Sequence, residues 1–236
     1  MKIRLAHPLI SCICITNNRP QMLLKNIVSF DAQNYPNREL VISYPKNDID
    51  TRRLIKKVVE VSGLNITTIE RQENESLGMA RNTAIENCNG EYICTWDDDD
   101  LYHYNRITHQ FNSMQGNYYQ CGILSKIIIY DYVTDQAYLS YPHHWGGTFI
   151  CKKDLITRNP YNDSNTGEEL YLLKELDYKG YLLKIDNAPF LYSYVRHKTN
   201  SVSGIHFQKF LNISDKLDVG ASKQLRQQFE TQINLQ

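Results

Sequence analysis

The stretch Glu91-Tyr92-Ile93-Cys94-Thr95-Trp96-Asp97-Asp98-Asp99-Asp100 joins a short apolar run to four consecutive aspartates. Residues 91–96 predict a buried strand, because the run is short, apolar and bounded by polar residues. The aspartates then follow the carboxyl end of that strand. In open α/β sheets, ligands bind in the crevice outside the carboxyl ends of the strands. We therefore expect residues 97–100 to lie at a functional site.

Alternating strands and helices precede this stretch. Predicted strands cover residues 9–15, 40–43 and 66–69, and predicted helices begin at Pro20 or cover 54–59 and 78–87. The first strand has apolar residues on both faces, as parallel strands buried between two helix layers do. The first helix must end before Pro36, since proline cannot continue it. This order predicts an α/β fold with a mostly parallel sheet and helices on both faces.

The pattern changes after the aspartates. Residues 123–130 and 137–141 predict an antiparallel hairpin, because a polar turn separates two β-branched or aromatic runs. Further predictions are a strand at 148–151, a helix at about 168–176, and strands near 182–185 and 190–195. The last 30 residues or so are expected to be helical and peripheral. The second portion is therefore smaller and antiparallel, within a single domain.

Composition limits the classes of function. The 236 residues include 26 Lys and Arg and 26 Asp and Glu, so net charge gives no reason to expect nucleic-acid binding. No apolar stretch approaches the roughly 20 residues of a membrane-spanning helix. The six cysteines form no C-x-x-C pair and are expected to be buried thiols. These features predict a cytoplasmic protein with at most peripheral contact with the inner face of a membrane.

The four aspartates predict a divalent cation site. Four like charges within one turn repel unless protons or a cation relieve them, and hard oxygen ligands suit Mg²⁺ or Mn²⁺. A solvated acidic turn is the alternative that the run alone leaves open. An EF-hand is excluded, because the sixth and twelfth positions counted from Asp97 are Tyr102 and Thr108 instead of glycine and glutamate.

Four blocks carry a resemblance to a known family. They are Ile15-Thr16-Asn17-Asn18-Arg19-Pro20, Gly78-Met79-Ala80-Arg81-Asn82, Trp96-Asp97-Asp98-Asp99-Asp100-Leu101-Tyr102 and Gly167-Glu168-Glu169. In this order the chain resembles the family-2 glycosyltransferases of the GT-A, Rossmann-like fold, from Leu9 to about Ser203. The resemblance implies a nucleotide-sugar-binding half at 1–102, an acceptor-side half at 103–205 and a peripheral helical tail at 206–236.

The resemblance also assigns donor-binding residues. Asp97 and Asp99 would form the D-x-D pair, with Asp97 near the donor ribose and Asp99 on a Mn²⁺ or Mg²⁺ ion that bridges the diphosphate. His197, in Tyr194-Val195-Arg196-His197, would complete the metal shell or touch the diphosphate. The remaining donor-side residues implied in this way are Thr16, Asn17, Arg19, Gly78, Arg81 and Asp98.

Glu169 is the candidate catalytic residue. By resemblance it is the general base that deprotonates the acceptor hydroxyl in an inverting reaction. Thr166-x-x-Glu169 is also a capping box, in which the glutamate would only bond a backbone N–H, and Glu168 is the alternative base. On the acceptor side, the resemblance points to Trp145, Gly146 and Gly147, with core packing as the other role open to the tryptophan.

Two departures from the family pattern concern the nucleobase. Asn17 stands where many relatives have tyrosine, and Tyr44-Pro45 follows the second strand where relatives have aspartates. We expect Tyr44 to supply the missing aromatic surface and Asp48 or Asp50 the missing acid, with UDP the favoured carrier.

The sequence therefore predicts a metal-dependent, inverting glycosyltransferase. Its expected partners are a nucleotide-sugar donor and a glycan or lipid-linked acceptor. Two alternatives stay open, which are a sugar-nucleotide-binding protein without turnover and a nucleotidyltransferase.

Overall fold

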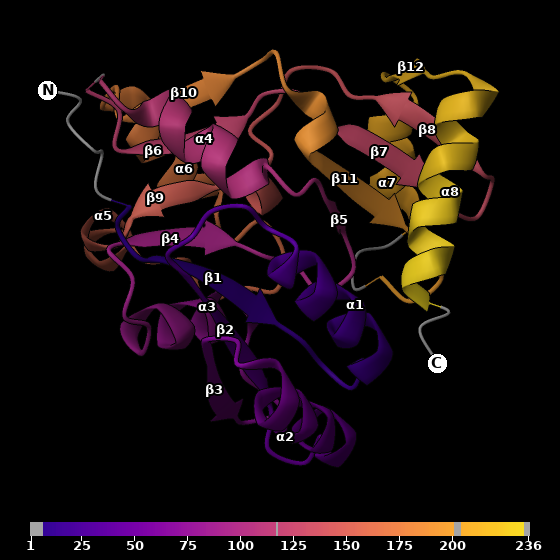
Figure 1. The fold of residues 1–236 in the computed structure, drawn as a ribbon. Helices are drawn as coiled ribbons and strands as arrows, with labels where there is room; N and C mark the ends of the chain where they lie inside the picture. Colours follow the sequence, from indigo (N-terminus) through magenta and orange to yellow (C-terminus); the bar gives the residue numbers. More distant parts are fainter. Residues whose placement is uncertain (1–6, 117, 201–203, 234–236) are drawn as a thin grey trace, which may run out of the picture.

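The computed structural model describes residues 7–116, 118–200 and 204–233, built around a central seven-stranded sheet (Figure 1). The strand order is β10-β6-β9-β4-β1-β2-β3. Residues 1–6, Ser203, where the predicted resemblance ends, and residues 234–236 of the predicted tail lie outside the described residues.

The central sheet is mostly parallel, as predicted. Its strands are β1 (Ile10–Ile15), β2 (Arg38–Pro45), β3 (Ile66–Arg71), β4 (Tyr92–Thr95), β6 (Cys121–Leu124), β9 (Ile150–Lys152) and β10 (Leu182–Ile185). All neighbouring pairs run parallel except those of β9, which is antiparallel to both β4 and β6. Strands from both sides of residue 102 therefore share one sheet.

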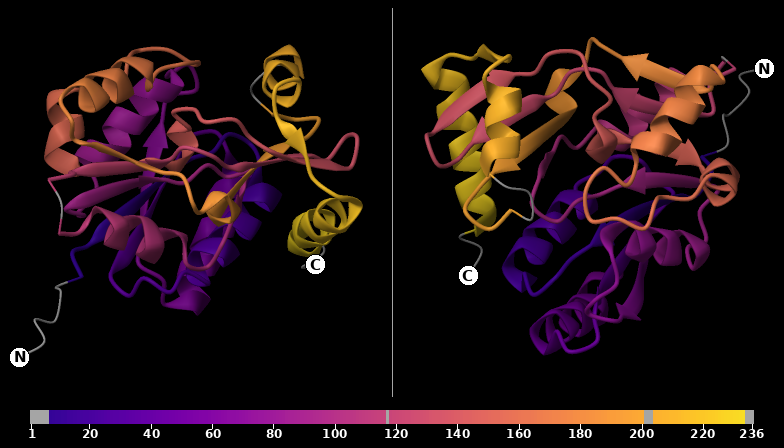
Figure 2. Two further views of the ribbon diagram at one scale, coloured as in Figure 1. Left: turned by 90° about the horizontal axis from the view of Figure 1, so that it is seen from above. Right: turned by 180° about the vertical axis from the view of Figure 1, so that it is seen from behind.

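Helices cover both faces of this sheet, which confirms the expected layering (Figures 1 and 2). One face carries α1 (Pro20–Asp31), α2 (Ile49–Ser62) and α4 (Arg106–Met114), and the other carries α3 (Leu77–Glu86), α5 (Lys153–Arg158) and α6 (Leu170–Tyr178). Strand residues alternate between the two layers, since Cys12 packs with the first set of helices and Ile13 with the second. Among the described residues, no helix is long and apolar enough to cross a bilayer.

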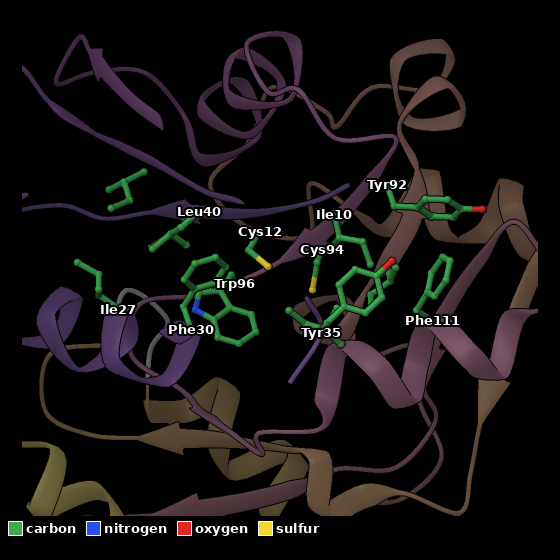
Figure 3. Close-up of a cluster of buried hydrophobic side chains, with 14 of the residues drawn as sticks. Ile10, Cys12, Ile27, Phe30, Tyr35, Leu40, Tyr92, Cys94, Trp96 and Phe111 are labelled. Carbon is green, nitrogen blue, oxygen red and sulfur yellow. The ribbon is translucent and has the colours of Figure 1, made fainter. Parts of the chain in front are cut away.

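The core beside α1 and α4 is rich in aromatic residues (Figure 3). Trp96 is fully buried and meets Phe30 of α1 edge-on, with ring centroids 6.1 Å apart. On its other side it stacks on Tyr102 at 3.9 Å. This packing fixes the chain on both sides of the four aspartates.

A second, five-stranded sheet has the order β12-β8-β7-β11-β5. Its strands are β5 (Leu101–Tyr102), β7 (Ile128–Asp131), β8 (Gln136–Leu139), β11 (Tyr192–Arg196) and β12 (Asp215–Lys216). β7 and β8 form the predicted antiparallel hairpin. The single strand predicted over 123–130 is wrong. The chain leaves the central sheet after Leu124 and enters the second sheet at Ile128, so one apolar run supplies two strands.

The last helices pack on this second sheet. They are α7 (Gly204–Leu211) and α8 (Val219–Ile233), and α8 lies beside β8 in Figures 1 and 2. Phe229 of α8 is 4% exposed and packs against Tyr132 and under the Lys25 amine of α1. The described part of the predicted tail is mostly helical, with the short strand β12 between its helices, but it contributes to the core and is not purely peripheral.

Candidate functional site

The carboxyl ends of β1, β3 and β4 open onto a pocket of about 690 Å³. The pocket lies where the sequence predicts a ligand crevice, with the four aspartates on its wall. Of the sequence-predicted site residues, the pocket is lined by Thr16, Asn17, Arg19, Arg81, Asp97, Asp98, Asp99, Trp145, Gly146, Gly147, Glu168 and Glu169.

Asp98 faces inward at the base of this wall. It is 3% exposed, and it accepts a 2.5 Å hydrogen bond from the Thr16 hydroxyl after β1. Arg19, at the start of α1, pairs with its other oxygen at 2.6 Å. Burial and the neighbouring Asp99 charge raise the pKa of Asp98 to about 7 despite the arginine. Asp98 therefore ties the loop after β1 to the loop after β4.

The Asp99 carboxylate is in contact with several polar side chains. Arg19 donates to its Oδ2 at 2.8 Å, and His197 Nε2 lies 3.3 Å from the same oxygen. The Nδ1 atom of His197 accepts the backbone N–H of Thr199. Burial by itself would raise the pKa of Asp99, but the hydrogen bond from His197 and the charge of Arg19 outweigh it and lower the pKa. Asp99 and His197, more than 90 residues apart, are thus brought together.

Asp97 belongs to a second ion-pair group. Arg81 of α3 donates to Asp97 Oδ1 at 3.0 Å and, through its other amine, pairs with Glu168. Burial alone would lower the pKa of Arg81, but the charges of Asp97 and Glu168 outweigh it and raise the pKa. The Asp97 carbonyl accepts bonds from Asn26 and Tyr102, each 2.7 Å long. Asp97 therefore has a fixed backbone and a partly open carboxylate.

Asp100 also lines the pocket, but its carboxylate is bonded to the second sheet. It is 5% exposed and accepts the Tyr192 hydroxyl and, at 2.9 Å, the backbone N–H of Val195. Its role is structural, because both partners belong to β11 and the bonds hold this strand beside β5.

The two glutamates that head α6 differ in environment. Glu168 is 4% exposed and is paired with Arg81. Glu169 is half-buried and lines the pocket, and within the described residues its carboxylate has no hydrogen-bond or ion-pair partner. The predicted capping box is wrong, since α6 begins at Leu170 with Glu169 itself at the N-cap and no side-chain capping bond. Glu169 is the glutamate left available for chemistry.

Gly146 and Gly147 form the floor between Glu169 and Asp97, in a 3₁₀ turn at Gly146–Thr148. A Cβ atom added at Gly146 would lie 2.8 Å from Glu169 Oε1. A Cβ atom added at Gly147 would lie 3.1 Å from Asp97 Oδ2 and 2.5 Å from the Tyr192 hydroxyl. Only glycine lets the two carboxylates approach this floor so closely.

Tyr44 does not lie where the sequence predicts it. The side chain is 3% exposed within the core cluster of α1 and α2, and its hydroxyl bonds Glu70 at 3.1 Å. It does not line the pocket, so the expected exchange with Asn17 is wrong. Asp48 is also occupied, because it caps α2 and accepts the backbone N–H of Asn18 at 2.7 Å. Asp50 lies in the exposed first turn of α2.

Gly78 and Trp145 make packing contacts within the chain. A Cβ atom at Gly78 would overlap the Asn162 carbonyl oxygen, so the close approach is to this chain's own loop and not to a ligand in the pocket. Trp145 is 6% exposed and packs on Phe210 and Tyr141, although one edge of it still lines the pocket. The packing role left open for Trp145 is therefore present.

The structure adds residues that sequence reasoning missed. Arg71, the last residue of β3, is 7% exposed, lines the pocket and donates to the Thr16 carbonyl at 2.8 Å. Its Nη1 has no partner among the described residues. Asn200 donates weakly to Asp99 at 3.4 Å. Arg71 could have been found from its place at the carboxyl end of a parallel strand.

The acidic residues fit a phosphate-bound cation better than a protein-enclosed one. Over the part of the chain that the structure describes, no group of three or more His, Cys, Asp or Glu side chains could hold a metal. Mg²⁺ is commonly held by one or two carboxylates while substrate phosphates and water fill its other positions. Asp99 with His197 beside it matches such an incomplete ligand set, whereas the Asp97 carboxylate is paired with Arg81.

A family model matches residues 11–169, which include the acidic run, Arg81 and Glu169. The chain belongs to glycosyl transferase family 2. The match covers more than half of the chain and ends at the glutamate that faces the pocket. The match thus runs from the first strand to the residue before α6.

Individual relatives are named as glycosyltransferases. An uncharacterized glycosyltransferase of Rickettsia prowazekii is 26% identical over 210 residues, 89% of this chain and 54% of the relative. UDP-Glc:alpha-D-GlcNAc-diphosphoundecaprenol beta-1,3-glucosyltransferase WfgD of Escherichia coli is 25% identical over 212 residues, 85% of this chain and 82% of the relative. The chain spans only 36% and 54% of the length of two of the curated relatives that it matches.

Among solved structures, the mannosyltransferase PcManGT of Pyrobaculum calidifontis, in complex with GDP-Man and Mn²⁺, matches with a TM-score of 0.67. The sequences are 14% identical, and the match covers 98% of this chain and 71% of the other. At this identity the likeness concerns the fold, which is the GT-A fold of family 2.

Proposed function

We propose that the protein is an inverting, metal-dependent glycosyltransferase that uses a UDP-linked sugar. The observation that carries this proposal is the placement of Glu169, an unpaired carboxylate, across the glycine floor from Asp97. A nucleotide sugar whose diphosphate lay at the aspartates would present its anomeric carbon over that floor. An acceptor hydroxyl arriving from the Glu169 side would then be in line with the departing diphosphate.

The donor side would be formed by the loops after β1, β3 and β4. Arg71 and Thr16 lie at the nucleoside end, and Arg81 and Asp97 lie nearer to the glycine floor. An arginine offers two parallel N–H bonds to a phosphate, so Arg81 and Arg19 suit the diphosphate. The relative from E. coli is named for a UDP-glucose donor, which favours UDP here.

Asp99, with His197 beside it, would hold Mn²⁺ or Mg²⁺ at the diphosphate. When bound, the ion would neutralise the charge that develops on the leaving diphosphate. Arg19 already supplies one positive charge at this place, because it bridges Asp98 and Asp99. The structure of the PcManGT complex with Mn²⁺ supports this kind of site by analogy.

Glu169 would act as the general base. Its carboxylate would accept the proton of the acceptor hydroxyl as the oxygen attacks the anomeric carbon, which inverts the configuration there. Glu168 is unsuited to this role, because its carboxylate is buried against the Arg81 guanidinium.

The acceptor would be a glycan or a lipid-linked glycan. The name of the E. coli relative specifies a GlcNAc-diphospholipid. The acceptor side of the pocket is lined by Trp145, Phe210 and Leu170, which offers apolar surface to a sugar face. A lipid-linked acceptor would bring the protein to a membrane surface as a peripheral partner.

The direct test is a donor screen. The protein is incubated with UDP-glucose, UDP-galactose, UDP-GlcNAc or GDP-mannose in Mn²⁺, Mg²⁺ or EDTA, and the released nucleotide is measured. An N-acetylglucosamine diphosphate alkyl ester serves as the acceptor. We expect metal-dependent UDP release that rises with acceptor. Binding of a nucleotide sugar without release of its nucleotide would instead indicate a binding protein. Pyrophosphate release when a nucleoside triphosphate replaces the nucleotide sugar would indicate a nucleotidyltransferase.

A further inference from the structure

Arg106 of α4 is a fully buried arginine at the back of the site. Its Nε atom donates to Gln110 Oε1 at 3.1 Å. Its Nη2 atom donates to two backbone carbonyls, those of Thr95 and Gly147, each at 3.0 Å. Arg106 therefore joins the end of β4 to the glycine floor of the pocket.

The Arg106 charge has no acidic partner. Within the described residues no ion pair reaches it, and its Nη1 atom has no hydrogen-bond partner. Three aromatic rings surround the guanidinium, with centroids 4.9 Å (Tyr102), 5.3 Å (Trp96) and 5.4 Å (Tyr192) from its central carbon. Such cation–π contacts offset part of the cost of burying a charge. Stability alone gives little reason to keep an unpaired buried charge here.

The contacts of Arg106 converge on one short segment, the Gly146–Thr148 turn. Gln110, one helical turn further along α4, donates to the Thr148 carbonyl at 2.8 Å. Two successive carbonyls of the turn are thus held from α4. The other face of the turn touches Glu169 at Gly146 and Asp97 at Gly147.

We propose that Arg106 is a positioning residue that holds the Gly146–Thr148 turn against the end of β4, and so sets the spacing between the Glu169 carboxylate and Asp97. The inference rests on the proposed function. Arg106 touches no substrate and reaches the reaction only through the turn. Loss of its two carbonyl bonds would let the floor shift, and a shift near 1 Å can reduce the rate about 100-fold.

Arg106→Lys tests the proposal, because lysine keeps the charge but cannot bond Gln110, Thr95 and Gly147 together. Arg38→Lys is the matched control. Arg38 also donates to backbone carbonyls, those of Phe30, Asp31 and Tyr35, and lies over the Phe30 ring at 5.2 Å. It stands at the opposite end of β2 from the pocket. The two variants therefore make the same chemical change with and without contact to the floor.

The measurements are UDP affinity in Mn²⁺, melting temperature, and UDP release with and without the N-acetylglucosamine diphosphate alkyl ester. We expect Arg106→Lys to keep UDP affinity within about 2-fold, to lower kcat for transfer about 10-fold to 100-fold, and to raise the ratio of donor hydrolysis to transfer. Arg38→Lys should lower the melting temperature and leave this ratio unchanged.

Equal ratios in Arg106→Lys, Arg38→Lys and the parent protein would overturn the inference and leave Arg106 a structural residue. If Arg106→Lys does not fold, Gln110→Leu is measured in its place, because it removes the bond to the Thr148 carbonyl on the same turn. An unchanged ratio in Gln110→Leu would then overturn the proposal, and a raised ratio would support it. Absence of transfer by the parent protein would instead contradict the proposed function.

Discussion

At Asp97–Asp100, four identical side chains take four different roles because their neighbours differ. Asp97 faces Arg81, Asp98 is buried against Thr16 and Arg19, and Asp99 lies beside His197. Asp100 holds β11. The chemistry of this segment therefore depends on which partner each carboxylate meets, and substitutions along it should have separable effects.

We expect Asp99→Asn to weaken UDP binding in Mn²⁺ more than about 10-fold, because a neutral amide is a poor ligand for a hard cation. Asp100→Asn should leave UDP affinity close to that of the parent protein and act on stability instead. Calorimetry with UDP in Mn²⁺ and in EDTA measures both effects. Equal affinity in metal and chelator would rule out the assignment of a metal to Asp99.

The two glutamates at the start of α6 give the next expectation. Glu169→Gln should lower kcat by roughly 10²- to 10⁴-fold, while donor affinity and melting temperature stay unchanged, because its side chain makes no capping bond. Glu168→Gln weakens a buried pair with Arg81 and should cost on the order of 1–3 kcal/mol of stability. The opposite pattern, with normal turnover in Glu169→Gln and loss in Glu168→Gln, would move the base by one position.

Most of the site residues predicted from the sequence line the pocket. The predictions were wrong where the direction of the side chain determines whether a residue reaches the pocket. The aspartates follow a strand end, so chain order brings them to the ligand crevice, and the family resemblance pointed to Arg81 and Glu169, which line the same pocket. Tyr44 also ends a strand, but its ring points into the core and not into the pocket. The predicted capping bond of Glu169 is absent because the helix begins three residues later than the capping box at Thr166 requires.

At the scale of elements, α8 packs across α1 and the second sheet. Phe229 of α8 lies under the Lys25 amine at 4.6 Å from the ring centroid, and its ring is also stacked on His197 at 6.2 Å. The C-terminal helix is therefore in contact with the histidine proposed as a metal ligand. This placement depends on a contact between distant segments, which periodicity within α8 could not predict.

The buried Lys25 amine should make the stability of the folded chain depend on pH. It is 7% exposed, and burial lowers its pKa from 10.5 to about 8. Below pH 8 both the folded and unfolded chains hold the proton, and the folded state carries the full cost of the buried charge. Between about 8 and 10.5 the folded chain loses its proton first, so stability rises with pH relative to a chain without this amine.

Lys25→Met should therefore raise the melting temperature by a few degrees at pH 7, and its advantage over the parent protein should shrink as pH rises from about 8 to 10.5. Lys57→Met, at an exposed position of α2, is the control and should change neither quantity. A constant difference between Lys25→Met and the parent protein across this range would show that Lys25 stays protonated when folded.

At the scale of the whole molecule, the strand and helix order predicted the parallel sheet and its two helix layers. Each of these elements has a clear period and a clear stop signal, such as Pro36 or the aspartates. The second sheet was less predictable, because residues 121–131 form two strands in different sheets without a glycine or proline between Leu124 and Ile128. The chain changes sheets there because β6 pairs with β10 in the central sheet and β7 pairs with β11 in the second sheet.

At the site, the acidic run after β4 and Glu169 before α6 face each other across the glycine floor. The loop after β4 carries the carboxylates proposed for the donor side and the loop before α6 carries Glu169, with the glycine floor between them. A base on the far side of the anomeric carbon from the leaving diphosphate requires in-line attack. The configuration of the product therefore depends directly on the proposed geometry.

The most direct measurement is the proton NMR coupling constant at the anomeric position of the transferred sugar, with an α-linked UDP-sugar as donor and the N-acetylglucosamine diphosphate alkyl ester as acceptor. We expect a β-linked product from the parent protein and no product from Glu169→Gln. An α-linked product, or full transfer by Glu169→Gln, would contradict the proposed geometry.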